Sequence, residues 1–160
     1  MYVLVKTHPH FLFWWRWLVV VTFGVLLFGI TMFVAPAPTR QFFGLLLFSS
    51  SRRLAAFGEP AVAYITLVHG VLGAVMFGWG TALLFVLLGP FRRGSKDAWT
   101  TLVISLLAWF VPDTVFSVWL RFWQNAALNA LIGLLFAVPL AATNRAVARQ
   151  IPGTHPSPPA

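Results

Sequence analysis

Cysteine is absent from this chain of 160 residues, and Asp and Glu together number only three. The lack of cysteine excludes a disulfide framework, a thiolate metal site, an iron–sulfur cluster and a cysteine nucleophile. The acids are Glu59, Asp97 and Asp113, and the first two fall in predicted loops. A pair of carboxylates inside a membrane, as two-carboxylate hydrolysis needs, is therefore excluded. Walker, HExxH, GxSxG and dinucleotide-binding motifs are missing as well, so the sequence leans away from an enzyme without deciding the question.

Charge of either sign is scarce. Charged residues make up 9% of the chain and hydrophobic residues 59%, whereas a soluble domain carries about 25% charged residues. A soluble globule of this size has too small an interior to hide so much apolar surface. A disordered chain is excluded as well, because disorder needs low hydrophobicity. The composition therefore predicts a protein that is embedded in a lipid bilayer.

Four apolar segments are long enough to cross a bilayer, which takes about 20 residues in helical conformation. They are expected at about residues 12–34, 61–88, 98–120 and 123–142. The alternation typical of transmembrane strands is absent. We therefore expect an all-α, polytopic membrane protein that forms a four-helix transmembrane bundle, with residues 1–160 in a single domain.

Proline and glycine mark the expected helix ends. Pro36 and Pro38 are predicted to stop the first helix, and the Gly89-Pro90 pair to end the second. Residues 41–48 are apolar but too few to span, so an interfacial helix or a short re-entrant piece is expected in the first outer loop. Residues 152–160 have the composition of a flexible tail.

The basic residues predict the orientation of the bundle. An even number of spans puts both termini on one side, which carries Lys6, Arg16, Arg92, Arg93, Lys96, Arg145 and Arg149. The other side carries Arg40, Arg52, Arg53 and Arg121. The excess on the first side places both termini in the cytoplasm and the protein in the cytoplasmic (inner) membrane. No nucleic-acid partner is expected despite a net charge of +8, because the basic residues flank apolar spans and form no stripe.

Tryptophan is frequent near the expected membrane boundaries. Such residues form the aromatic belts of spanning helices. They are Trp14, Trp15, Trp17 and Trp99 toward the predicted inner side, and Trp119 and Trp123 toward the outer side.

Polar residues at one depth are the strongest functional signal, since such residues are costly inside a membrane. Away from the ends of the spans, only His69 and Asp113 are ionisable. At about 1.5 Å per residue, His69 lies about 12 Å from the outer end of its helix, Asp113 about 10 Å and Asn129 about 9 Å. Three helices thus place polar groups at nearly one level in the outer half of the bilayer.

Helical spacing extends this level into a candidate polar pocket. Its predicted residues are His69, Asp113, Ser117, Arg121, Asn125 and Asn129, which recur at helical intervals on their helices. Pro112 lacks an N–H and is predicted to free the carbonyl of Ala108 beside them. Three interpretations remain open: hydrogen bonds that hold helices together, a pocket for a small ligand or lipid headgroup, and a proton-binding pair of His69 with Asp113.

No cofactor or metal is predicted. Haem ligation through His69 is not expected, because a second intramembrane histidine is missing. Gly70, Ala74 and Gly78 recur every four residues, a spacing that lets another helix approach closely. This face is expected to pack within the bundle or, alternatively, against another membrane protein or a second copy of the chain.

The run from residue 61 to 142 resembles a known group of proteins. It contains HGVLGAVMFGWG, GPFRRGSKDAW, WFVPDTVFSVW and QNAALNA. In these runs it is similar to uncharacterised bacterial four-helix membrane proteins of DoxX-like layout. The resemblance implies four short spans in a bacterial inner membrane and a redox role linked to quinone, and it assigns no functional residue.

Three functions are consistent with the sequence. A non-enzymatic subunit or accessory of a larger membrane complex is favoured, because such short loops leave only the bilayer-embedded surfaces for partners. The alternatives are a carrier of a lipid, a quinone or a proton that uses the polar pocket, and a DoxX-like redox component.

Overall fold

The computed structural model describes residues 9–48 and 57–148, and these residues form helices joined by short turns, without a strand. The elements are α1 (Pro9–Val34), α2 (Pro36–Phe48), α4 (Glu59–Val86), the π-helical turn η1 (Leu87–Phe91), α5 (Lys96–Trp119) and α6 (Trp123–Ala148). Four of the helices are long and apolar enough to cross a membrane: α1, α4 with η1, α5 and α6. The all-α class and the four spans predicted from the sequence are thereby confirmed.

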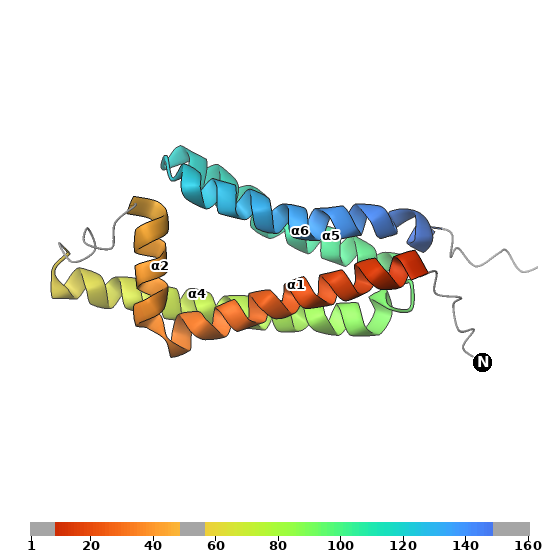
Figure 1. The fold of residues 1–160 in the computed structure, drawn as a ribbon, viewed down its shortest axis with the longest axis horizontal. Coiled ribbons are helices and arrows are strands. Elements are labelled where there is room, and N and C mark those ends of the chain that lie inside the picture. The colour runs from red at the N-terminus through yellow and green to blue at the C-terminus, as the bar shows by residue number, and fades with distance from the viewer. Residues whose placement is uncertain (1–8, 49–56, 149–160) are drawn as a thin grey trace, which may run out of the picture.

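The four long helices form two antiparallel pairs, α1 with α4 and α5 with α6 (Figure 1). The pairs lie close together at the end of the bundle where α1 begins and α6 ends, and they diverge toward the other end. At that second end α2 lies across the long helices and contacts α1, α4 and α6. We call the two ends the terminus end and the α2 end.

The first helix ends at Val34, just before the prolines, as the sequence predicted. Ala35 alone separates α1 from α2, and Pro36 opens the second helix, a position where its missing N–H is tolerated. The expected short helix over residues 41–48 exists, but it begins five residues earlier and forms one continuous element. The predicted tail at 152–160 and the arginines at 52 and 53 lie outside the described residues.

The Gly89-Pro90 pair marks the end of the second span, as predicted, but it lies inside the π-helical turn η1, which carries the span to Phe91. Gly89 departs from helical geometry there, with φ −92° and ψ −105°. Such π-helical turns leave backbone groups without their usual helical partners. The indole of Trp15, from α1, donates to the carbonyl oxygen of Leu87 in this turn at 2.8 Å.

Two other tryptophans also connect helices at the terminus end. Trp17 of α1 donates to the carbonyl oxygen of Leu135 at 3.1 Å, and Trp99 of α5 donates to that of Leu140 at 2.8 Å. Pro139 lies inside α6 and has no N–H, so the carbonyl of Leu135 lacks its usual helical donor. These belt residues therefore satisfy backbone carbonyls of neighbouring helices, a role that their number and position did not reveal.

Glycine brings α1 and α4 into close contact. A Cβ atom on Gly73 would lie 2.6 Å from the carbonyl oxygen of Gly29, and one on Gly29 would lie 2.9 Å from that of Gly73. Gly80 faces Leu26 in the same interface, at 3.0 Å from the site of a Cβ. The backbones can approach this closely only because both positions lack a side chain.

The expectation that Gly70, Ala74 and Gly78 form the packing face within the bundle is wrong. A Cβ on Gly70 or Gly78 would meet nothing within 4 Å, and Ala74 is exposed. The glycines that meet α1 are instead Gly73 and Gly80, which are seven residues apart and lie on another face of α4. Contact of the open face with another protein remains a prediction.

The tightly packed interior lies mainly toward the terminus end. Leu18, Leu87 and Phe91 are almost completely buried there, and the ring of Phe91 stacks on Phe11 at 5.6 Å between centroids. Toward the α2 end the pairs separate, and side chains from both pairs face a shared space. The candidate site therefore lies toward the α2 end, where the pairs separate.

Candidate functional site

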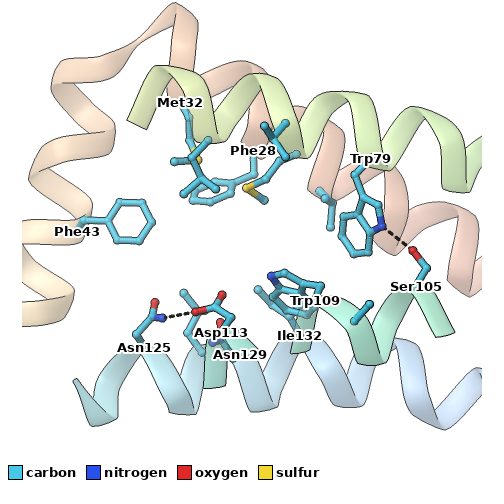
Figure 2. A pocket seen from close by; sticks show the side chains of 16 residues that line it. Phe28, Met32, Phe43, Trp79, Ser105, Trp109, Asp113, Asn125, Asn129 and Ile132 are labelled. Atoms are coloured by element: carbon cyan, nitrogen blue, oxygen red, sulfur yellow. Dashed lines mark hydrogen bonds between the residues drawn. The ribbon is translucent and has the colours of Figure 1, made fainter. Parts of the chain in front are cut away.

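A cavity of about 510 Å³ lies between the two helix pairs, toward the α2 end (Figure 2). This volume is in the range of pockets that hold small organic ligands. All five helices contribute to its lining. The residues are Val25, Phe28, Met32, Phe43, Leu72, Val75, Met76, Trp79, Ser105, Ala108, Trp109, Asp113, Asn125, Leu128, Asn129 and Ile132.

One wall of the cavity is polar and is built by α5 and α6 (Figure 2). The amide nitrogen Nδ2 of Asn125 donates to Oγ of Ser117 at 2.8 Å and to Oδ1 of Asp113 at 3.3 Å. Ser117 Oγ in turn lies 2.7 Å from the carbonyl oxygen of Asp113, to which it donates. These bonds fix the Asp113 carboxyl group between the two helices. This part of the wall matches the interpretation of polar groups that hold helices together.

Asn129 lies on the same wall but has a different environment. Its side chain is only 3% exposed, and its Nδ2 atom has no hydrogen-bond partner. Among the described residues, Thr22 and Thr114 also carry a buried oxygen without a partner, but neither lines the cavity. A buried donor without a partner costs about 1–3 kcal/mol. Asn129 thus brings to the cavity wall a buried donor that still needs an acceptor.

The backbone of α5 adds an acceptor to this wall. Pro112 lies inside α5 and cannot donate to the carbonyl oxygen four residues earlier, which belongs to Ala108. Ala108 lines the cavity, as the sequence predicted it would lie beside the polar level. Figure 2 also shows the indole nitrogen of Trp109 directed toward the open space.

Aromatic residues close the cavity on the side nearer the terminus end. The indole nitrogen of Trp79, from α4, donates to Oγ of Ser105, from α5, at 2.7 Å. The ring of Trp79 lies 5.8 Å from that of Trp109, with an angle of 38° between the planes. This contact bridges the two helix pairs, which otherwise meet little between α4 and α5.

Helix α2 covers the cavity at the α2 end. Phe43 points from α2 into the space, and its ring meets His69 of α4 edge to face at 5.0 Å. Arg40 of α2 donates through Nη1 to Oγ1 of Thr66 at 2.8 Å, and Phe48 lies 6.3 Å from Phe122 beyond the end of α5. These contacts attach α2 to both helix pairs.

The cavity is open on one side, between α4 and α5. Leu72 and Val75 line it, yet they are 47% and 61% exposed, and Ala108 opposite them is exposed as well. On the opposite side α1 packs against α6, and Phe28 contacts both Phe42 and Phe43 of α2. In a bilayer the opening between α4 and α5 faces the lipid. We call it the α4–α5 opening.

The structure brings together four of the six predicted pocket residues: Asp113, Ser117, Asn125 and Asn129. His69 does not join them, because its ring faces Phe43 and its Nδ1 lies 2.7 Å from the carbonyl oxygen of Ile65 on its own helix. The predicted pair of His69 with Asp113 is therefore not formed. Depth along the helix was a correct criterion for α5 and α6, but it does not determine the face of α4 on which a side chain lies.

Arg121 is also outside the cavity. It lies in the turn between α5 and α6 with φ 63°, and its side chain is exposed. The four-residue stripe that ran through Trp109 and Asp113 toward Arg121 ends with the helix at Trp119. Past that point the turn, and not the helical period, sets the direction of the side chain.

Sequence reasoning missed the apolar lining and the role of Ser105. Ser105 stands four residues before Trp109 and so extends the predicted stripe by one turn, which is a signal that the sequence carries. Phe28, Met32 and Trp79 gave no such signal, because apolar residues on a membrane helix look alike whether they face lipid, a core or a cavity.

Comparisons of the chain with protein-family models, curated proteins and solved structures find no match. The DoxX-like layout therefore remains a prediction. Within residues 9–48 and 57–148, no three His, Asp or Glu side chains lie together in a way that could hold a metal ion.

Proposed function

We propose that this small integral membrane protein binds a membrane-dissolved amphipathic molecule in the cavity between its helix pairs. The observation that carries the proposal is the cavity itself, of about 510 Å³ with one polar wall and otherwise apolar sides. Pockets for small molecules combine apolar walls with a few placed polar groups in this way. The α4–α5 opening gives such a molecule a path from the bilayer.

Asn129 supports ligand binding over a purely structural role for the polar wall. Asn125 and Ser117 have partners, so hydrogen bonding between helices accounts for them. Asn129 is buried at the cavity with a donor that no described residue satisfies. A bound polar group would supply the missing acceptor.

Native mass spectrometry of the protein purified in mild detergent tests the proposal. We expect a small-molecule adduct on the parent protein. Leu128→Trp should remove the adduct, because Leu128 lines the cavity and a larger side chain would fill it. Leu131→Trp is the matched control, because Leu131 lies on the same helix and is 56% exposed. Equal adducts on both variants would show that the molecule binds elsewhere.

A role as a subunit or accessory of a larger membrane complex is a second candidate. It is favoured by the open face of α4, where Gly70 and Gly78 meet nothing within 4 Å. Gly70→Leu and Gly78→Leu should each reduce the mass of the complex on a native gel, because a bulky side chain separates close-packed backbones. Gly24→Leu is the control, since Gly24 is also exposed but lies on α1. Unchanged migration of all three variants would show that this face meets lipid only.

A further inference from the structure

The α5–α6 side of the cavity offers hydrogen-bond donors and acceptors that have no partner among the described residues. The buried donor is Nδ2 of Asn129, and the indole nitrogen of Trp109 faces the same space. One acceptor is the carbonyl of Ala108, which Pro112 leaves without its helical partner. The other is Oδ2 of Asp113, since within the described residues the bonds from Ser117 and Asn125 reach only Oδ1 of its carboxyl group. Figure 2 shows Asn125, Asp113 and Asn129 together on this wall.

A hydroxyl group meets this combination best, because it accepts and donates hydrogen bonds through one oxygen. A ketone would satisfy only the donors, and an ammonium group only the acceptors. The wall therefore favours a head group that both donates and accepts hydrogen bonds.

Charge in the lining argues against an anionic head. The sixteen residues that line the cavity include Asp113 and no Lys, Arg or His. A phosphate or carboxylate placed there would lie beside a carboxyl group without a cation, and burying an unpaired charge is costly. Arg40 and Arg121 are near the same end, but Arg40 bonds Thr66 and Arg121 is exposed in a turn.

The apolar chain of the proposed ligand is expected at the α4–α5 opening. Leu72 and Val75 at the opening are apolar and exposed, so an acyl or isoprenoid chain can leave the cavity there and remain among the lipid tails. The polar head would then sit on the α5–α6 wall, across the cavity from Phe28 and Met32 of α1.

We infer that the cavity binds an uncharged lipid with a hydroxyl head, of the class of acylglycerols and isoprenoid alcohols, and that Asn129 selects this head. The inference rests on the proposed function and adds the chemical class of the ligand.

Photocrosslinking in nanodiscs tests the inference on the full chain. The neutral probe is a monoacylglycerol with a diazirine in its acyl chain, and the comparison probe carries the same chain on glycerol phosphate. Crosslinks are mapped to cavity residues and, as an internal reference, to lipid-facing positions such as Val115, which is 61% exposed. We expect the neutral probe to label the cavity and the phosphate probe to label only lipid-facing positions.

Variants connect the labelling to Asn129. Asn129→Leu should lower cavity labelling by the neutral probe about five-fold, as expected for one lost hydrogen bond. Asn144→Leu, an exposed asparagine on the same helix, should leave it unchanged. Ala108→Phe narrows the α4–α5 opening and keeps Asn129, so it should also lower cavity labelling by the neutral probe. If Asn129→Leu does not fold, this variant tests whether the neutral probe binds in the cavity.

The outcomes separate the inference from the proposed function. Equal cavity labelling by both probes, or full labelling of Asn129→Leu, would overturn the hydroxyl class while the cavity remained a binding site. Absence of cavity labelling by either probe, with normal labelling at Val115, would contradict both.

Discussion

Asp113 connects the two helices that form the polar wall. Its Oδ1 accepts hydrogen bonds from Asn125 and Ser117, and its backbone carbonyl accepts a second contact from Ser117. One carboxyl oxygen therefore accepts hydrogen bonds from side chains of both α5 and α6. The position is polar for a structural reason, and its second oxygen remains available to a ligand.

Two substitutions of Asp113 distinguish the loss of its hydrogen-bond acceptor from the loss of its ionisable group. Asp113→Asn keeps an oxygen for Asn125, so we expect the unfolding free energy to stay near that of the parent. Asp113→Leu removes the acceptor and should lower it by about 1 kcal/mol, the scale of such bonds in membranes. Reversible unfolding in mixed detergent measures both. A large loss in Asp113→Asn alone would mean that the ionisable group itself stabilises the fold.

Trp17 supplies a donor to a carbonyl that a proline has left without one. Trp17→Phe keeps most of the ring but exposes the carbonyl of Leu135, and we expect a loss of about 0.5–1.5 kcal/mol in unfolding free energy. Trp119→Phe is the control, because Trp119 is 78% exposed. The assignment fails if the two variants have the same unfolding midpoint.

At the scale of the elements, glycine determines how closely α1 and α4 can pack. A methyl group on Gly73 would press on the backbone of Gly29, which cannot move away independently of its helix. The neighbouring face of α4 has open space, so two glycines on one helix differ sharply in what they tolerate.

Alanine substitutions should reveal that difference. Gly73→Ala should lower the unfolding free energy by about 1–3 kcal/mol, as expected for overpacking at a close contact. Gly78→Ala should leave it unchanged or raise it slightly, since alanine is the better helix former. Thermal unfolding of the two variants in the same detergent provides the comparison. Similar losses in both would show that Gly78 is also covered, for example by a second chain.

At the scale of the whole molecule, the two ends of the bundle have different properties. At the terminus end, buried apolar side chains and indole-to-carbonyl bonds hold the pairs together. At the α2 end, the pairs separate around the cavity and are joined by a helix that lies across them. A closely packed end and an end with an accessible pocket suit a protein that binds a molecule from one leaflet.

The basic residues predict which end of the bundle faces the cytoplasm. We predict that the terminus end is cytoplasmic, so a reporter fused after Ala160 should behave as cytoplasmic and one inserted near Ser50 as extracytoplasmic. Paired reporters that are active on opposite sides of the membrane provide the measurement. The reverse pattern would place the cavity in the inner leaflet and would change the lipids that can reach it.

The sequence by itself determined the class of the protein and the location of its helices. A backbone in hydrocarbon must satisfy its own hydrogen bonds, so runs of apolar residues such as those before Val34 and after Trp123 could form only spanning helices. It also determined which polar residues lie at one depth, because the rise per residue is fixed. Asp113 and Asn129 were predicted together for this reason, Asn125 was added by helical spacing, and the three meet on one wall.

Only the tertiary structure decided which face of each helix meets another. Rotation about a helix axis depends on close contacts, and the contact of Gly29 with Gly73 turns α4 so that His69 faces Phe43 and not Asp113. In a soluble protein an apolar stripe reveals that rotation, but a membrane helix is apolar on every side. For the same reason the cavity, the α4–α5 opening and the unmatched donor of Asn129 became visible only when the two helix pairs were placed side by side.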